Sequence, residues 1–210
     1  SNSMTSFEPK QKRSEATLNK IVAAMQTLVE EKYFEQITIA EIARESGMSV
    51  GTFYRRFENK EAALPVLYQH FETGMRCWMA DSAQRWQHMV VEDLVRDMAS
   101  GIYYFFKQQR GLMRTIHVYA RLRPDLISQP QLEERKTDYD KLASLLLPFV
   151  QSQDPEADAR FLVFTLVTLA LEKAAYPGLT PSIATPQLDD DLIDELTLLG
   201  LGYLKQVNSK

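Results

Sequence analysis

The sequence of 210 residues contains one cysteine, Cys77. An intrachain disulfide is therefore impossible, and a cysteine-rich metal site is excluded. The longest strongly apolar run, Phe161–Leu171, is far shorter than the ~20 residues that a membrane-spanning helix needs. The polar N-terminus also has no apolar segment that could act as a signal peptide. We therefore expect no membrane association and a cytoplasmic location.

Motifs of enzyme chemistry are also missing. The sequence has no phosphate-binding loop, no dinucleotide fingerprint and no His-x-x-x-His pair. Gly47–Gly51 satisfies G-x-S-x-G, but that chemistry requires a strand before the serine and a histidine nearby. A helical pattern precedes this serine, and the three histidines lie well downstream. We therefore expect no catalytic site, no metal and no cofactor.

Charge is distributed unevenly along the chain. The formal net charge is −4, which by itself argues against general coating of nucleic acid. Residues 1–64 carry nine basic and nine acidic side chains, whereas residues 151–210 carry four basic and nine acidic ones. Any contact with a polyanion is therefore expected in the first third of the chain, through a few well-placed cations.

Apolar residues recur at three- and four-residue steps almost throughout, and no segment alternates as a strand does. The sequence therefore predicts an all-α protein of about nine helices. Three segments are expected: residues 1–13 as a vector remnant (Ser1-Asn2-Ser3) and flexible arm, residues 14–58 as a three-helix domain, and residues 59–210 as a six-helix bundle.

The segment 38–57 has the punctuation of a helix-turn-helix. Thr38 and Glu41 form a capping box before a short helix, and Gly47 can end that helix in the left-handed conformation. Ser49 can cap a second helix that is expected to reach about Phe57. Such a second helix can enter a DNA major groove if its exposed edge is narrow.

The run TIAEIARESGMSVGTFYRRFENKEAAL at residues 38–64 resembles the DNA-binding domain of the TetR family of transcriptional regulators. The resemblance covers roughly residues 14–64. It implies that Tyr54 and Lys60 contact phosphates, that Thr52, Arg55 and Arg56 form the reading edge, and that Thr38 and Ser49 lie near the DNA backbone. Val50 departs from the family pattern, and it could belong to the core or contact a thymine methyl group.

The family resemblance implies that the C-terminal bundle dimerises and often binds a ligand. The run Phe161–Leu171 independently favours a dimer, because it is apolar on nearly every face and must be covered on two sides. A wholly intrachain central helix is the alternative. The predicted dimer interface comprises Phe161, Phe164, Leu171, Leu192, Leu196, Leu199 and Tyr203.

A ligand pocket is the least specific of these predictions. Large side chains on inward faces are commonly only core, and a buried histidine is commonly only hydrogen-bonded. If a pocket exists, its lining predicts an apolar or aromatic effector. The candidate residues are Trp78, Met98, Phe106, Met113, His117 and Phe164.

Together these patterns predict a homodimeric, DNA-binding regulator, with repression relieved by a small molecule. The alternative is a helical dimer that binds a small molecule or a protein without reading DNA.

Overall fold

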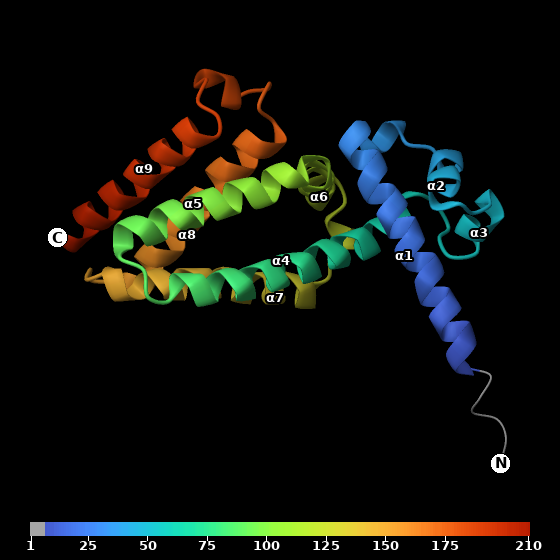
Figure 1. Cartoon of the computed structure of the whole chain (residues 1–210), viewed down its shortest axis with the longest axis horizontal. Helices are drawn as coiled ribbons and strands as arrows, with labels where there is room; N and C mark the ends of the chain where they lie inside the picture. Colours follow the sequence, from blue (N-terminus) through green and yellow to red (C-terminus); the bar gives the residue numbers. More distant parts are fainter. Residues whose placement is uncertain (1–6) are drawn as a thin grey trace, which may run out of the picture. The chain divides into compact units, whose positions relative to one another are not determined.

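The computed structural model describes residues 7–210, and within that range it contains helices and no strand (Figure 1). The predicted all-α fold is confirmed. The chain divides into two compact units, one formed by residues up to 72 together with 115–126, the other by residues 73–114 and 127–210. No helix in the described range is both long and apolar enough to span a membrane.

The first unit is a helical domain built on one long helix. It contains α1 (Phe7–Glu31), η1 (Phe34–Gln36), α2 (Ile39–Ser46), α3 (Val50–Tyr54), η2 (Glu61–Ala63) and η3 (Pro124–Leu126). Parts of α4 (Leu64–Trp86) and α6 (Arg110–Leu122) complete it. Its buried residues include the predicted apolar stripe of α1 and the anchors of the short helices: Ile21, Val22, Met25, Leu28, Val29, Ile42, Phe53 and Phe57.

Several predicted boundaries differ from the observed ones. Residues 7–13 belong to α1, so the prediction of a flexible arm is wrong for them, while residues 1–6, with the vector remnant, lie outside the described residues. The second short helix stops at Tyr54 instead of near Phe57. The predicted boundary at residue 58 also differs from the observed units, because residues 59–72 and 115–126 group with the N-terminal domain.

Proline in α4 does not interrupt the helix. Proline in the interior of a helix removes a backbone hydrogen bond and bends the axis. Because α4 begins at Leu64, Pro65 lies in its first turn, where the N–H groups have no intrahelical partner. Asn59 accepts from the N–H of Ala62 at 2.8 Å, as a cap for the preceding turn η2.

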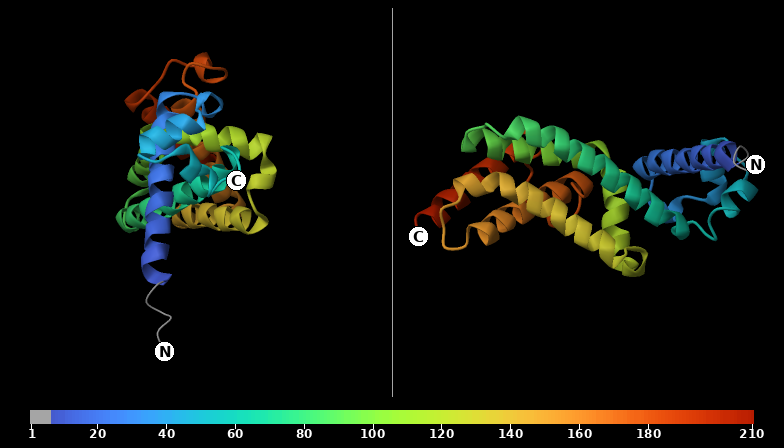
Figure 2. Two further views of the ribbon diagram at one scale, coloured as in Figure 1. Left: turned by 90° about the vertical axis from the view of Figure 1, so that its right-hand side faces the viewer. Right: turned by 90° about the horizontal axis from the view of Figure 1, so that it is seen from below.

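The second unit is a bundle whose central contacts are made by α5 and α8. It contains α5 (Val91–Gln108), α7 (Gln129–Leu146), η4 (Leu147–Phe149), α8 (Pro155–Ala175), η5 (Ser182–Ala184) and α9 (Asp190–Asn208). Helix α5 packs against α8 and α9, and α7 packs against the other side of α8 (Figures 1 and 2). A Cβ at Gly200 would lie 2.7 Å from the Val95 side chain, so glycine allows α9 to approach α5 closely.

The start of α9 is fixed by long-range polar contacts. Thr185-Pro186 has the composition of a helix start, but α9 begins at Asp190. Its N-cap, Asp189, has φ 54° and accepts hydrogen bonds from Tyr103 at 2.9 Å and Lys107 at 2.6 Å. These bonds hold an uncommon backbone conformation in place, which no local start signal encodes.

Candidate nucleic-acid interface

The turn between α2 and α3 has the predicted chemistry. Thr38 accepts from the Glu41 N–H at 3.1 Å, and the Glu41 carboxylate accepts from the Thr38 N–H at 2.8 Å. Gly47 has φ 70°, the left-handed conformation that ends α2. Ser49 caps α3 by accepting from the Thr52 N–H at 3.1 Å, and its hydroxyl lies 2.9 Å from that of Thr52. The G-x-S-x-G serine is therefore a helix cap in a helix-turn-helix.

Helix α3 separates a buried side from an exposed one. Phe53 is buried and anchors the helix, whereas Val50 and Tyr54 are 41% and 54% exposed. Arg55, directly after the helix, is also exposed, and Thr52 is half-buried. The two alternatives for Val50 are thereby separated, because its exposure excludes the core role. The exposed edge combines one apolar group with hydroxyl and guanidinium donors, which suits a groove floor bordered by phosphates.

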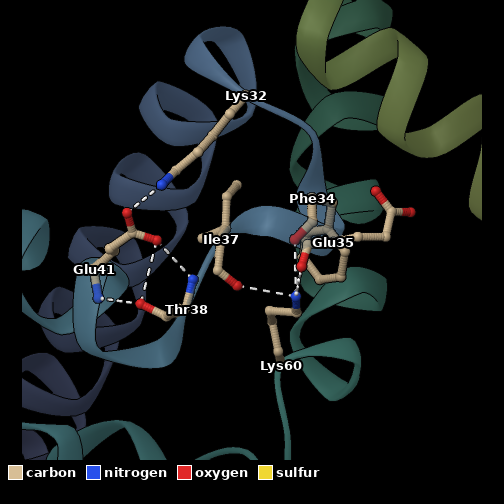
Figure 3. A network of polar contacts seen from close by, with 7 residues as sticks. All are labelled: Lys32, Phe34, Glu35, Ile37, Thr38, Glu41 and Lys60. Carbon is tan, nitrogen blue, oxygen red and sulfur yellow. Dashed lines mark hydrogen bonds and ion pairs between the residues drawn. The ribbon is translucent and has the colours of Figure 1, made fainter.

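Lys60 does not extend outward as the predicted phosphate contact. Its ammonium donates to the carbonyl oxygens of Phe34, Glu35 and Ile37 at 2.8, 3.3 and 2.9 Å (Figure 3). It also lies 4.6 Å from the centre of the Phe34 ring. An ammonium has three N–H donors, and all three are used within the chain. In this structure Lys60 ties the segment before α4 to the turn η1, and its role as a phosphate contact stays a prediction.

Arg56 likewise turns toward the protein. Its Nη2 atom donates to the carbonyl oxygen of Ser14 and, at 2.5 Å, to the Ser14 hydroxyl. The side chain is half-buried. The prediction that Arg56 belongs to the reading edge is thus not what the structure displays, because the guanidinium joins the end of α3 to α1.

A second polar contact holds the beginning of α2. The Lys32 ammonium pairs with the Glu41 carboxylate (Figure 3). The hydrogen bond from Lys32, followed by that from the Thr38 backbone, lowers the pKa of Glu41 from 4.5 to about 2. Glu41 therefore serves both the capping box and the attachment of α2 to the end of α1.

Tyr119, from α6, contacts the same turn as Lys60. Its hydroxyl donates to Glu35 at 2.9 Å, and its ring lies edge-on to Phe34 with centroids 5.0 Å apart. Burial, then the hydrogen bond to Glu35, raises the pKa of Tyr119 above its ordinary value. Turn η1 is thus held from two sides, by Lys60 and by Tyr119. Sequence reasoning missed Tyr119 because its partners lie more than eighty residues earlier.

Residues 21–65 match the family described as bacterial regulatory proteins, tetR family. The helix-turn-helix region of this chain is therefore of the TetR-family type. This match supports a DNA-binding transcriptional regulator. A comparison of the sequence with curated proteins finds no match.

Solved structures share the TetR-like fold over nearly the whole chain. A transcriptional regulator from Rhodococcus sp. RHA1 is 16% identical, with 91% of this chain and 97% of that chain covered and a TM-score of 0.69. The fatty acid degradation regulator FadR from Bacillus halodurans is 18% identical, with coverage of 90% and 94% and a TM-score of 0.61. FadR from Bacillus subtilis in complex with stearoyl-CoA is 20% identical, with coverage of 90% and 97% and a TM-score of 0.56. At these identities the likeness shows the fold alone.

The predicted pocket residues are not one group in this structure. Met98, Phe106 and Met113 are buried in the second unit, whereas Phe164 is 61% exposed on α8. Phe164 is therefore corrected as a pocket residue. Trp78 is half-buried and stacks on Phe105, with ring centroids 5.0 Å apart.

His117 belongs to the first unit, and it is half-buried. Burial, followed by the nearby Arg121 charge, lowers the pKa of His117 below its ordinary value. Within the described residues, no group of three or more His, Cys, Asp or Glu side chains could hold a metal ion.

The predicted dimer residues divide between two faces. Leu192 and Leu196 are 5% and 3% exposed, since they lie on the side of α9 that packs within its own unit, and their assignment to the interface is corrected. The exposed side of α8 and α9 instead carries Phe161, Phe164, Leu169, Leu198 and Leu199. Leu171 and Tyr203 are half-buried, and the Tyr203 ring lies 5.6 Å from that of Phe161.

Proposed function

We propose that this TetR-family protein is a homodimeric repressor that binds a pseudo-palindromic operator and leaves it when an apolar small molecule binds. The observation that carries the DNA-reading part is the construction of α3. A buried Phe53 fixes the helix from below, and Val50, Tyr54 and Arg55 remain exposed on its outer side. Thr52, Ser49 and Thr38 are the further proposed DNA contacts from the same turn.

The dimer is supported by the exposed apolar face of α8 and α9. Phe161 is 54% exposed, Phe164 61% and Leu198 65%, and these side chains are too large and too many to lie on one side of a bundle without a partner. A second copy is the proposed occupant, because a twofold axis would pair this face with itself. The same symmetry would place two reading helices about 34–36 Å apart, which is one turn of duplex.

The effector is proposed from the interior of the second unit. Met98, Phe106 and Met113 are large, adaptable side chains of the kind that line apolar sites. The structure of Bacillus subtilis FadR contains stearoyl-CoA, and this compound is therefore a suitable first probe. A coupling of ~1–3 kcal/mol between effector and DNA would lower operator affinity about five- to hundred-fold.

The test begins with selection of duplexes from a randomised library by the purified protein. The selected duplex should bind at least about 10³-fold more tightly than its scrambled counterpart at physiological salt. Arg55→Ala should relax preference at one base pair by about 1–3 kcal/mol. If no duplex is enriched and no salt-dependent binding occurs, the alternative of a helical module that does not read DNA is favoured.

Dimerisation is tested separately by light scattering of the eluting protein. The wild type should have about twice the 24.1 kDa chain mass. Phe164→Asp should yield a single chain, because it places a charge in the proposed apolar seam. Leu132→Asp is the matched control, since Leu132 is 46% exposed and belongs to α7 instead of α8 or α9. Dissociation by both variants, or by neither, would contradict the proposed interface.

A further inference from the structure

The N-terminal turns of α1 are helical but contribute nothing to the core. Every residue from 10 to 16 is exposed, and the buried residues of this helix begin at Ile21. In Figure 1 this end of α1 extends past α2 and α3. A chain segment that stays helical without burying side chains offers its outer groups to another molecule at fixed spacing.

One face of this overhang is positioned by the end of the reading helix. Arg56, two residues after α3, binds the backbone and the hydroxyl of Ser14. At about 100° per residue, Ser14 lies within about 20° of Ile21 and Met25 around the helix. The face that packs on the helix-turn-helix therefore continues, toward the N-terminus, as a polar face beside the end of α3.

Basic side chains are concentrated on the overhang. Lys10, Lys12 and Arg13 lie within four residues, and Glu8 and Glu15 are the acidic residues of the same segment. Around the helix, Lys10 lies about 40° from Ser14 and Arg13 about 100° from it, whereas Lys12 lies about 160° away, on the opposite side. Lys10 therefore lies on the side adjoining the reading helix, Arg13 lies at the edge of that side, and Lys12 lies on the opposite side.

The chemistry of this face fits phosphate better than a protein or a membrane. Residues 10–16 contain no large apolar side chain, so they lack the groups that anchor protein interfaces or enter a bilayer. Lysine and arginine on a rigid helix are suited to the evenly spaced charges of a duplex backbone. The neighbouring α3 brings that backbone close when it enters a groove.

We propose that Lys10 and Arg13 form a phosphate-binding surface for the DNA backbone that flanks the groove read by α3. This proposal rests on the DNA-reading function proposed above. The overhang would fix the orientation of the helix-turn-helix on the duplex, and it would take over a role that Lys60 cannot perform while its donors bind carbonyl oxygens.

The experiment measures binding to the selected duplex, and to its scrambled counterpart, over a series of salt concentrations. Lys10→Gln/Arg13→Gln removes four cations from the bound dimer and should lower the magnitude of the log–log salt slope by about 3.6, because each phosphate contact contributes about 0.9. The loss should be equal for both duplexes, since phosphates carry no sequence information. Lys12→Gln, on the opposite side of the same helix, should leave the slope at the wild-type value.

Three results would overturn the proposal. In the first, the double variant keeps the wild-type slope. In the second, Lys12→Gln reduces the slope per charge as much as the double variant does. In the third, the double variant loses affinity only for the selected duplex. In each case the wild type still binds DNA, and only the α1 surface is refuted. If the wild type enriches no duplex, the proposed function itself fails, which is a distinct outcome.

Discussion

Replacement of Lys60 by methionine tests whether this residue is a structural tie or a DNA contact. Methionine retains the length and apolar character of the stem but removes the ammonium. Two of the three hydrogen bonds, to Phe34 and Ile37, are part-buried, while the longer one to Glu35 is exposed. Loss of the two part-buried bonds should cost about 2–4 kcal/mol, because hydrogen bonds from a charged donor are each worth about 1.5–3 kcal/mol and water replaces them in part.

Hydrogen exchange is the appropriate assay, because both tryptophans, Trp78 and Trp86, lie in the second unit and cannot report on the first. A loss of ~2–4 kcal/mol should reduce protection of α2 and η1 amides about 30- to 700-fold, at tenfold per ~1.4 kcal/mol. Lys20→Met, on the exposed side of α1, is the control and should leave protection unchanged.

The opposite role gives a different result. If Lys60 contacted a phosphate in each protomer, Lys60→Met would leave amide protection intact and lower the magnitude of the salt slope of the dimer by about 1.8. That combination would refute the structural reasoning. Lys60→Arg adds a further check, because a planar guanidinium cannot direct its donors to three converging carbonyls and should restore only part of the protection.

Two other predictions concern α6. Tyr119→Phe removes the hydroxyl bond to Glu35 but keeps the ring on Phe34, so protection of η1 amides should fall by about 1 kcal/mol; Tyr103→Phe, which breaks a similar 2.9 Å bond to Asp189 in the other unit, should leave η1 unchanged. Burial lowers the pKa of His117 from 6.5, so folding favours the neutral ring. The resulting contribution to the free energy of unfolding is fully present above pH 6.5 and is lost as pH falls through the folded-state pKa. The free energy of unfolding of wild type should therefore decrease more steeply below about pH 6.5 than that of His117→Asn; parallel curves would exclude the histidine as the cause.

Local signals predicted the helix-turn-helix well, because its boundaries are set by neighbouring residues. The Thr38–Glu41 box, the left-handed Gly47 and the Ser49 cap each act within four residues, and each is found as expected. Phe53 and Phe57, which are four residues apart, are both buried. A pattern that is complete within one turn of helix can be recognised without knowledge of the rest of the fold.

The failures have a common physical origin in contacts between distant segments. Lys60 sits at a helix start by sequence, but its partners lie 23 to 26 residues earlier. Arg56 reaches Ser14 across 42 residues. Both are cations next to a reading helix, where a phosphate partner is the reasonable local expectation. Only the folded arrangement reveals carbonyl oxygens that compete for them.

The orientation of α9 shows the same limit in apolar residues. Leucines occur on several sides of this helix, so periodicity alone does not tell which side is internal. The side is decided by Gly200, where the absence of a side chain lets α9 rest on Val95 of α5. Leu192 and Leu196 are consequently buried, and Leu198 and Leu199 face outward.

Turn η1 has a position in the chain that gives its contacts particular weight. Helices α4 and α6 each contain residues of both units, and each delivers one contact to this turn or to the residues beside it: Lys60 stands just before α4, and Tyr119 is part of α6. The same turn leads directly into Thr38 and the start of α2. Turn η1 therefore connects both helices to the start of α2, and single substitutions at Lys60 or Tyr119 test how this turn is held.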